Sequence, residues 1–211
     1  MACSLVSKRI EPLEPYAVRD KTPVVIVLVE GLETQYWRIN NQKLKWVSVD
    51  VPEAIVLREK LLPHEPNLSA LSFSALLPAW MDHVPTDAPP FISAAGLLMY
   101  FKETEIRQLL GAIADRFPGA ELFFDTITPM VSRKTLKGAK ITKHYTAPPT
   151  PWGIQFDDIP ACFDSLPGWS LTSAQTHAEP YPNQMVPYNS LTHIGPIRRA
   201  FAGSLVHAKA A

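Results

Sequence analysis

The chain has 211 residues, 46% of them hydrophobic, so it is long and apolar enough to bury a sizeable core. Lys and Arg number 20, as do Asp and Glu, and this balance leaves no basic footprint for nucleic acid or an anionic membrane surface. No apolar run approaches the ~20 residues of a membrane-spanning helix. We therefore expect a globular protein that binds neither nucleic acid nor membrane.

The first 22 residues are polar and interrupted by prolines, so we expect an N-terminal arm followed by one α/β domain over residues 23–211. The start of the chain lacks the apolar core of a signal peptide. The two cysteines, Cys3 and Cys162, form no motif. The expected compartment is therefore the reducing cytoplasm.

The stretch 24–50 is the one around which the rest is organised. Residues 24–29 form an uninterrupted β-branched and aliphatic run, which is typical of a strand buried on both faces of a parallel sheet. A turn at Glu30-Gly31 follows, and a second predicted strand, 45–49, ends at Asp50. An acid at this position holds a ribose hydroxyl in doubly wound folds, so the stretch resembles a nucleotide-binding edge.

Two helices are predicted around this second strand. Residues 34–39 fit a short helix, or simply large apolar side chains packed in the core. Residues 52–62 fit a helix with Pro52 in its first turn, where proline is accepted. Its apolar residues recur at roughly helical spacing and should face the core. They are Ala54, Ile55, Leu57, Leu61 and Leu62.

The next part of the chain alternates between strands and helices. We expect a third strand at 68–73, a short helix at 78–84, and a fourth strand at 89–95 that continues into 96–101. The clearest helix is 103–117, whose apolar side chains lie on one face. They are Ile106, Leu109, Leu110, Ile113 and Phe117.

The C-terminal part completes the predicted sheet. A fifth strand at 121–128 again has an acid near its end, Asp125. Residues 157–163 fit a short helix and 169–175 a sixth strand, and the last residues should supply a helix and a closing strand. Strands that alternate with helices predict a mostly parallel sheet with right-handed crossovers.

Residues 129–151 differ in composition from the rest. They are basic and then proline-rich, and we expect a helix or loop that covers the active edge of the sheet on the substrate side. The basic run has two interpretations, a solvated face or an anion site. His144 and Tyr145 in this segment are either general bases for a phenol or carboxylic acid, or part of an exposed loop. The sequence identifies no other catalytic residue, and its scattered histidines predict no metal site.

Several motifs in this order resemble the leucine carboxyl methyltransferase family, and within it the bacterial and fungal O-methyltransferases of polyketide tailoring. The resemblance extends over about 24–128 and continues loosely beyond. It rests on the motifs GLETQYWRI, VDVPEAIVLREKLLP, SALLPAWMDHVP, GLLMYF and FPGAELFFDTITP. It implies a class I methyltransferase fold, which is Rossmann-like and doubly wound, with a mostly parallel sheet and an antiparallel strand at the C-terminal end.

The resemblance also implies the cofactor and its site. S-adenosylmethionine would lie at the carboxyl ends of the first, second and fourth strands, with Asp50 accepting hydrogen bonds from the ribose. Asp50 has an alternative role, the capping of the helix that begins near Pro52. The implied cofactor-binding residues are Glu30, Gly31, Asp50, Ala75, Leu76 and Ala95.

The chain departs from the family pattern at four places. Val29 replaces the first glycine of a Gly-x-Gly turn, although Val29 could instead extend the buried strand. Leu77 replaces an acid near the adenine, and Ala95 replaces a glutamate. The family also has more sequence before the first strand, including an arginine near the cofactor carboxylate. Neither Arg9 nor Arg19 matches that arginine, so we expect a more open pocket with weakened cofactor binding.

These observations leave three hypotheses. The first is an S-adenosylmethionine-dependent O-methyltransferase acting on a small-molecule carboxylate or a polyketide-like phenolic hydroxyl, with an eroded cofactor site. The second is an inactive methyltransferase-fold scaffold or partner subunit, which would require a protein partner or a homo-oligomer. The third is a reading frame whose missing upstream segment would restore the pocket.

Overall fold

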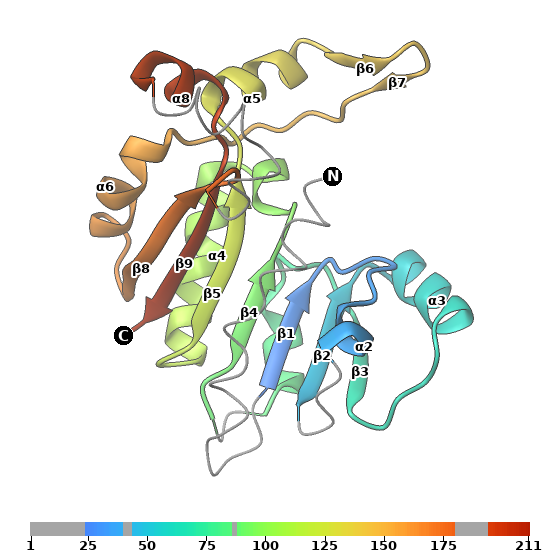
Figure 1. Cartoon of the computed structure of the whole chain (residues 1–211). Helices are drawn as coiled ribbons and strands as arrows, with labels where there is room; N and C mark the ends of the chain where they lie inside the picture. Colours follow the sequence, from blue (N-terminus) through green and yellow to red (C-terminus); the bar gives the residue numbers. More distant parts are fainter. Residues whose placement is uncertain (1–23, 40–43, 86–87, 180–193) are drawn as a thin grey trace.

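The computed structural model describes residues 24–39, 44–85, 88–179 and 194–211. The predicted arm over 1–22 lies outside them, as do Arg9, Arg19 and Cys3. Within the described residues, one sheet of seven strands has the order β3-β2-β1-β4-β5-β9-β8 (Figure 1). Its strands are β1 (Val24–Leu28), β2 (Lys45–Asp50), β3 (Leu68–Ser72), β4 (Phe91–Ala94), β5 (Glu121–Thr126), β8 (Trp169–Thr176) and β9 (Ser204–Ala210).

The expected strand directions are confirmed. Strands β3, β2, β1, β4 and β5 pair in parallel, whereas β9 pairs antiparallel with both β5 and β8. The helices are α2 (Gln35–Ile39), α3 (Pro52–Leu61), α4 (Glu103–Arg116), α5 (Pro129–Leu136), α6 (Ile159–Asp164) and α8 (Gly195–Phe201). Short 3-10 helices are η2 (Pro78–His83), η3 (Leu98–Tyr100) and η4 (Phe156–Asp158).

The core has two layers because alternate side chains of a strand point to opposite faces. Val24, Ile26 and Leu28 of β1 pack in the larger cluster, together with α4 and α6. Val25 and Val27 pack in a smaller cluster that includes two residues of α2. The predicted apolar face of the helix over 103–117 is confirmed, since all five of its residues are buried in the larger cluster.

Helix α3 presents a different face from the one expected. Leu57 and Leu61 are exposed, whereas Ile55 and Arg58 are its buried residues. The prediction that Leu57 and Leu61 face the core was wrong because Ile55 and Arg58, one turn apart, define the inner stripe. A buried arginine on this stripe requires partners, which are described below.

Two further expectations need correction. The fourth strand ends at Ala94, and the chain turns at 95–97 before η3, so 96–101 does not continue the strand. Beyond α5, the chain forms a β-hairpin of β6 (Lys140–Thr142) and β7 (Tyr145–Thr146), which the sequence did not predict. The turn residues there, Lys143 and His144, carry no glycine or asparagine signal for a hairpin.

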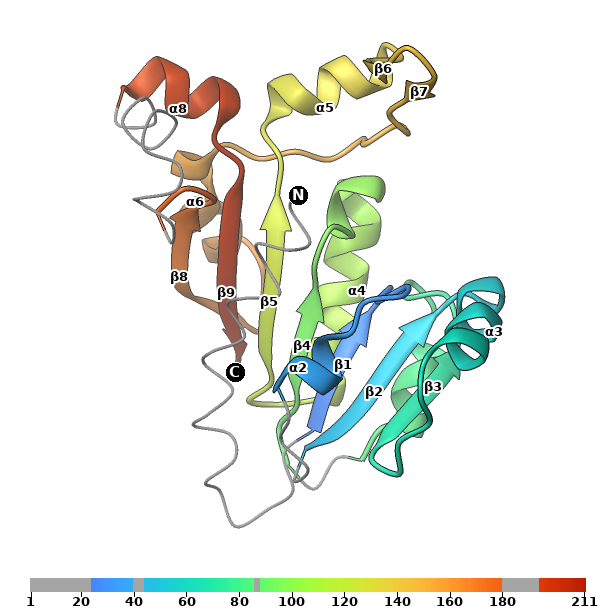
Figure 2. The ribbon, with the colours of Figure 1, turned by 45° about the vertical axis from the view of Figure 1, so that its right-hand side comes forward.

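Helix α5, the β6–β7 hairpin and α8 lie beyond the carboxyl ends of the parallel strands (Figures 1 and 2). The base of this region is fixed by Thr150, whose carbonyl accepts from the Ser132 hydroxyl at 2.7 Å and whose N–H donates to Thr135 Oγ1 at 3.1 Å. The assignment of 129–151 as a cover for the substrate remains a prediction, as does the division into an arm and one domain.

In the part of the chain described here, no helix has both the length and the apolarity needed to cross a bilayer.

Replacing Leu122 with alanine should lower the free energy of unfolding by about 2–5 kcal/mol, because its fully buried side chain on β5 would leave a cavity. The matched control is Leu57→Ala, at an exposed position of α3, which should change that free energy by no more than about 0.5 kcal/mol. Urea unfolding followed by circular dichroism measures both. Equal losses in the two variants would contradict this description of the core.

Candidate functional site

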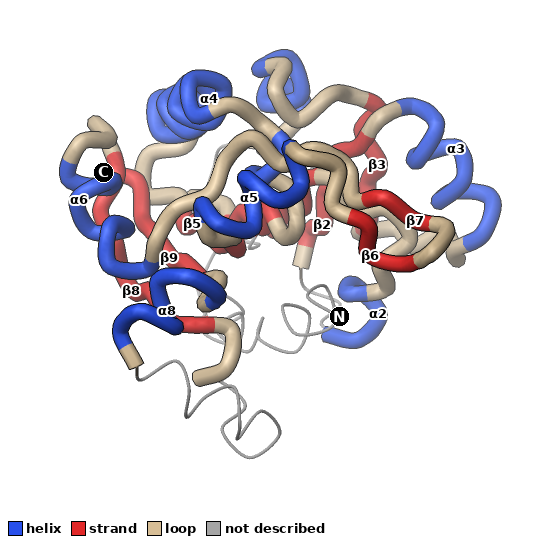
Figure 3. The backbone as a smooth tube through the Cα atoms, turned by 90° about the horizontal axis from the view of Figure 1, so that it is seen from above, coloured by secondary structure: helices blue, strands red, loops and turns tan. Residues whose placement is uncertain are grey.

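The sheet reverses its winding between β1 and β4, which are neighbours although β1 continues to β2 on one side and β4 to β5 on the other. Ligands of open α/β sheets bind in the crevice beyond the carboxyl ends of the strands at such a point. Figure 3 looks down on this edge, with α5 and the hairpin crossing in front of the sheet. The loops that follow β1, β2, β3 and β4 therefore define the candidate site.

Asp50 joins the ends of β1 and β2. Its Oδ2 accepts from the backbone N–H of Gly31 at 2.9 Å, and its Oδ1 accepts from the N–H of Val51 at 2.8 Å. The side chain is almost fully buried. The alternative that Asp50 caps α3 is wrong, because Val51 is the N-cap and no side chain caps this helix. Asp50 fixes the loop after β1 instead.

Val29 does not extend the buried strand, so that interpretation is corrected. The strand ends at Leu28, and Val29 has a φ of 58° with 40% of its surface exposed. Its N–H still donates to the carbonyl of Val49 at 2.7 Å. A left-handed conformation costs a residue with a side chain about 1–2 kcal/mol, and such strain clusters at functional sites. At position 29 the backbone therefore has a conformation that favours glycine, although the residue is valine.

Glu30 points away from the crevice edge and into the protein. Its Oε2 accepts from Trp46 Nε1 at 3.1 Å and from the Ser48 hydroxyl, and Arg58 Nη2 lies 3.0 Å away. Burial raises the pKa of Glu30, whereas the Arg58 guanidinium and these two hydrogen bonds lower it. Because these partners occupy the carboxylate, only the backbone of Glu30 is available to contact a cofactor. Such a contact remains a prediction.

The loop after β3 places the predicted adenine-side residues. Ala75 is buried, and its carbonyl accepts from Trp80 Nε1 at 3.1 Å. Leu76 is half-buried against the larger core cluster, while Leu77 is 57% exposed. The side chain that replaces the family's acid is therefore an exposed apolar group. Contacts of Ala75 and Leu76 with an adenine remain predictions.

The loop after β4 is fixed in the same way as the loop after β1. Asp125, near the end of β5, accepts from the N–H of Gly96 through Oδ1. Gly96 has a φ of 66° and follows the half-buried Ala95. Thus each flanking strand, β2 and β5, supplies a buried aspartate that holds a glycine on the neighbouring inner loop. Ala95 itself has no polar side chain, and its contact with a cofactor remains a prediction.

His177 lies close to the Asp125 end of β5. Its Nε2 is 3.2 Å from the carbonyl of Ser204, and a Cβ on Gly203 would lie 2.9 Å from the His177 ring. Burial lowers the pKa of His177, against the opposing influences of the Asp125 charge and the Ser204 carbonyl. Burial likewise raises the pKa of Asp125, against the Gly96 N–H and His177. This pair was not identified from the sequence because its members lie in separate segments of the chain.

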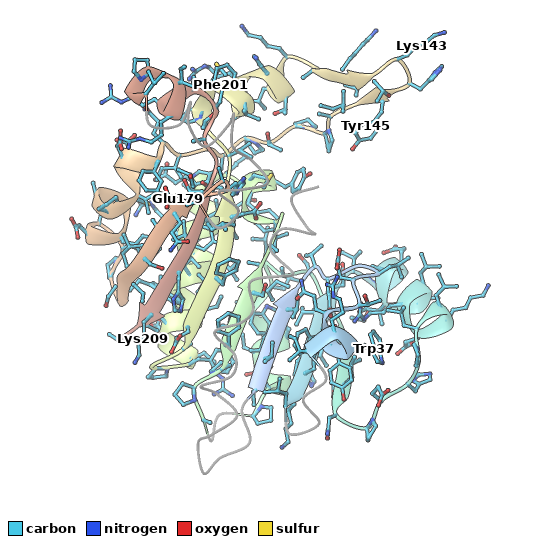
Figure 4. The ribbon with its side chains drawn as sticks, in the orientation of Figure 1. Trp37, Lys143, Tyr145, Glu179, Phe201 and Lys209 are labelled. Atoms are coloured by element: carbon cyan, nitrogen blue, oxygen red, sulfur yellow. The ribbon has the colours of Figure 1, made fainter. Side chains whose placement is uncertain are left out.

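The two predicted candidates for a general base are exposed. His144 occupies the turn of the β6–β7 hairpin, and Tyr145, in β7, is 55% exposed. Figure 4 shows Tyr145 and Lys143 on this projecting hairpin, away from the sheet. The structure thus places them on an exposed hairpin and not beside Asp50 or Gly96.

Among the described residues, no group of His, Cys, Asp and Glu could hold a metal ion.

A separate, small apolar pocket lies between α4 and α6. Phe124, Trp152 and Phe163 line it, with Glu103 and Arg107 among its few polar neighbours. No described residue of the loops after β1, β2, β3 or β4 contributes to its wall. It is therefore distinct from the candidate site.

Arg58 is the main residue of the site region that was not predicted from the sequence, and it is only 3% exposed. The available signal was its spacing, because Arg58 lies three residues after Ile55 and shares its face of the helix. The sequence could not show that a loop 27 residues earlier, at Gly31, would meet it there.

Replacing Val29 with glycine should raise the free energy of unfolding by about 0.5–1 kcal/mol, because glycine adopts positive φ without steric cost. The control Val56→Gly, at an exposed helical position of α3, should lower it. Chemical denaturation of both variants checks the prediction. A less stable Val29→Gly variant would mean that the valine side chain contributes packing that outweighs the strain.

The imidazole of His177 should titrate below the ordinary pKa of 6.5. In an Asp125→Asn variant its pKa should fall further, because the carboxylate charge that favours the protonated ring is removed. An NMR pH titration of the ring protons, assigned with a His177→Gln variant, measures both values. A midpoint at or above 6.5, or an upward change in Asp125→Asn, would contradict the described environment.

No protein-family model matches the chain. Over 134 residues, 62% of this chain, it is 30% identical to the tetracenomycin polyketide synthesis O-methyltransferase TcmP of Streptomyces glaucescens. The match spans 48% of that relative, about half its length.

Solved structures with the same architecture cover nearly the whole chain. One carries the description of a methyltransferase from Thermobifida fusca, with a TM-score of 0.69 and 17% identity, covering 99% of this chain and 80% of that one. Another is the N-methyltransferase NodS of Bradyrhizobium japonicum in complex with S-adenosyl-L-homocysteine, with a TM-score of 0.56 and 11% identity, covering 98% and 87%. At such low identities these likenesses show the fold alone. Together, the strand order and the structural neighbours confirm the expected class I methyltransferase fold, and the sequence match shows that 134 residues of the chain are similar to one polyketide O-methyltransferase.

Proposed function

We propose that this protein is an S-adenosylmethionine-dependent O-methyltransferase that acts on a small-molecule carboxylate or phenolic hydroxyl. The main observation behind this proposal is the hydrogen bond between Gly31 and Asp50, next to the point where the sheet reverses its winding. In the same loop, Val29 has a strained left-handed backbone. Strain of this kind lowers stability and is typical of ligand sites, where the backbone shape is needed. The O-methyltransferase named among the relatives and the methyltransferases among the structural neighbours support the same proposal.

The residues at this edge fit the cofactor. A Cβ added to Gly31 would meet nothing within 4 Å, so there is open space beside the loop backbone for a ligand to approach. Each carboxylate oxygen of Asp50 accepts one backbone N–H and retains a further lone pair for a ribose hydroxyl. Ala75 and Leu76 would provide an apolar surface for the adenine. Ala95 lies on the opposite loop, where it would flank the ligand.

When bound, the cofactor supplies an electrophilic methyl group. The protein's contribution is to hold the acceptor oxygen in line with that methyl, and such positioning accounts for much of the rate enhancement in group transfer. Asp50 and Asp125 hold the two loops that flank the crevice and keep their shape fixed. A carboxylate acceptor is already ionised at neutral pH and needs no base, which agrees with the exposed positions of His144 and Tyr145.

The 129–151 segment supports an anionic acceptor. It contains five Lys and Arg residues and no Asp or Glu, whereas the rest of the chain has 15 Lys and Arg against 20 Asp and Glu. It lies beyond the carboxyl ends of the parallel strands (Figures 1 and 2). A positive surface above a crevice attracts anionic molecules and raises their association rate. We therefore assign 129–151 to the substrate side of the site.

The scaffold hypothesis has no specific observation in its favour. Val29 and Ala95 remove possible ligand contacts, but the loops that carry them are each held by a buried aspartate. Weakened cofactor binding at an eroded site remains a prediction, which the dissociation constant for S-adenosylmethionine tests. The proposed partner is a small-molecule acceptor. A protein partner, a homo-oligomer and a cytoplasmic location remain predictions from the sequence.

Calorimetric titration of the purified chain with S-adenosylmethionine and S-adenosyl-L-homocysteine should give saturable binding at one site. Asp50→Asn should weaken it roughly ten- to one-hundred-fold, because a charge-assisted hydrogen bond contributes about 1.5–3 kcal/mol. Asp82→Asn, at an exposed position of η2, is the matched control and should bind like the wild type. The protein should also transfer a labelled methyl group from the cofactor to aromatic carboxylic acids and phenols. The corresponding amides should be poor acceptors.

Two results would contradict the proposal. One is the absence of binding by the wild type at millimolar cofactor. The other is binding that Asp50→Asn leaves unchanged, since the cofactor would then lie elsewhere.

A further inference from the structure

Helix α3 directs a cation into the protein interior. Arg58 is 3% exposed, and its salt-bridge partner Glu30 is similarly buried, with side-chain exposures of 3% and 1%. Removing a guanidinium from water is costly unless its donors find acceptors. The buried position of Arg58 therefore needs a specific reason, and its partners indicate what that is.

Among the described residues, the polar partners of the Arg58 side chain belong to the loop after β1. Its Nη1 donates to the carbonyl of Gly31 at 2.8 Å and to the carbonyl of Glu33 at 2.9 Å. Its Nη2 lies 3.0 Å from Oε2 of Glu30. The guanidinium also sits over the ring of Trp37, 5.8 Å from the centroid. One planar side chain thus contacts the loop at three points of its turn.

Gly31 is consequently held from both sides. Its N–H donates to Asp50 at the end of β2, and its carbonyl accepts from Arg58 in α3. With both polar groups of Gly31 engaged, the orientation of the two peptide units around it is fixed. Val29, two residues earlier, has its left-handed conformation within the same turn.

Glu30 anchors the arrangement to the sheet. Trp46 and Ser48 of β2 both donate to its Oε2. The carboxylate therefore connects Arg58 to β2, while the backbone carbonyls of the loop connect it to the turn. Oε1 of Glu30 and the Nε and Nη2 of Arg58 have no hydrogen-bond partner among the described residues, so the pair is not optimised for stability alone.

We propose that Arg58 is a positioning residue for the cofactor: it holds the loop 29–33 in the shape that presents Gly31 and Asp50 to the ligand. This inference rests on the proposed function. Arg58 acts through the loop and does not touch the ligand, so it is not a catalytic residue. The competing explanation is that Arg58 merely attaches α3 to the sheet, in which case the shape of the loop would not depend on it.

The test compares the wild type with the double variant Glu30→Gln/Arg58→Met. Neither change is made alone, because removing one partner leaves a buried charge and can unfold the protein. In the double variant neither charge remains, and the new amide oxygen can still accept from Trp46 and Ser48.

Two further variants separate geometry from charge. Arg58→Lys keeps the charge but cannot reach both carbonyls and the carboxylate together, because an ammonium lacks the planar fork of a guanidinium. Arg38→Met is the matched control, because Arg38 is an exposed cation that pairs with Glu33 of the same loop.

Three quantities are measured: the thermal midpoint, amide hydrogen exchange over residues 31–33, and the Kd for S-adenosyl-L-homocysteine. In the double variant we expect a midpoint within a few degrees of the wild type, at least tenfold faster exchange in the loop, and at least tenfold weaker binding. Arg58→Lys should give an intermediate loss, and Arg38→Met should match the wild type in all three.

Unchanged exchange and an unchanged Kd in a folded double variant would overturn the proposal and leave Arg58 as a structural attachment. If the wild type binds neither S-adenosylmethionine nor S-adenosyl-L-homocysteine, the proposed function fails. The exchange rates still test the role of Arg58 in that case, because their measurement needs no ligand. Unchanged exchange over residues 31–33 in the double variant would overturn the proposal that Arg58 holds the loop.

Discussion

The hydrogen bond from the Gly31 N–H to the Asp50 carboxylate is the interaction on which the candidate site depends. It crosses from the loop after β1 to the end of β2, and its counterpart crosses from Gly96 to Asp125 near the end of β5. Both glycines have positive φ, so each loop turns sharply as it leaves the sheet. Because β1 and β4 are neighbours at the centre of the parallel strands, the two aspartates hold these loops on either side of the point where the sheet reverses its winding.

The buried pair of Glu30 and Arg58 belongs to the same arrangement. A buried ion pair is weak evidence for stability, since desolvation offsets most of the attraction. Its value here lies in geometry, because Arg58 reaches two loop carbonyls while Glu30 is fixed by β2. In the loop after β1, the N–H of Gly31 thus donates to Asp50, while the carbonyls of Gly31 and Glu33 accept from Arg58. A strained valine can persist in such a loop because the surroundings determine its conformation.

The sheet could be predicted from the sequence because its signals are local. The apolar run before Glu30, the five-residue apolar face of α4 and the acids Asp50 and Asp125 each lie within one segment. Alternation of strands and helices then restricts the topology to a mostly parallel sheet. Asp50 could be named as a candidate site residue because its position at the end of β2 follows from that topology alone. The remaining features depend on contacts between distant segments: Arg58 meets Gly31 across 27 residues, and the left-handed Val29 contradicts its own side-chain preference, so local propensity predicts a longer strand.

The most direct test of the account is a crystal structure of the chain with S-adenosyl-L-homocysteine. We predict that the ribose hydroxyls bind the Asp50 carboxylate, that the ligand passes beside Gly31, and that Arg58 keeps its contacts with the Gly31 and Glu33 carbonyls. A ligand bound away from the ends of β1 and β2, or a loop that releases Arg58 when the ligand binds, would contradict it.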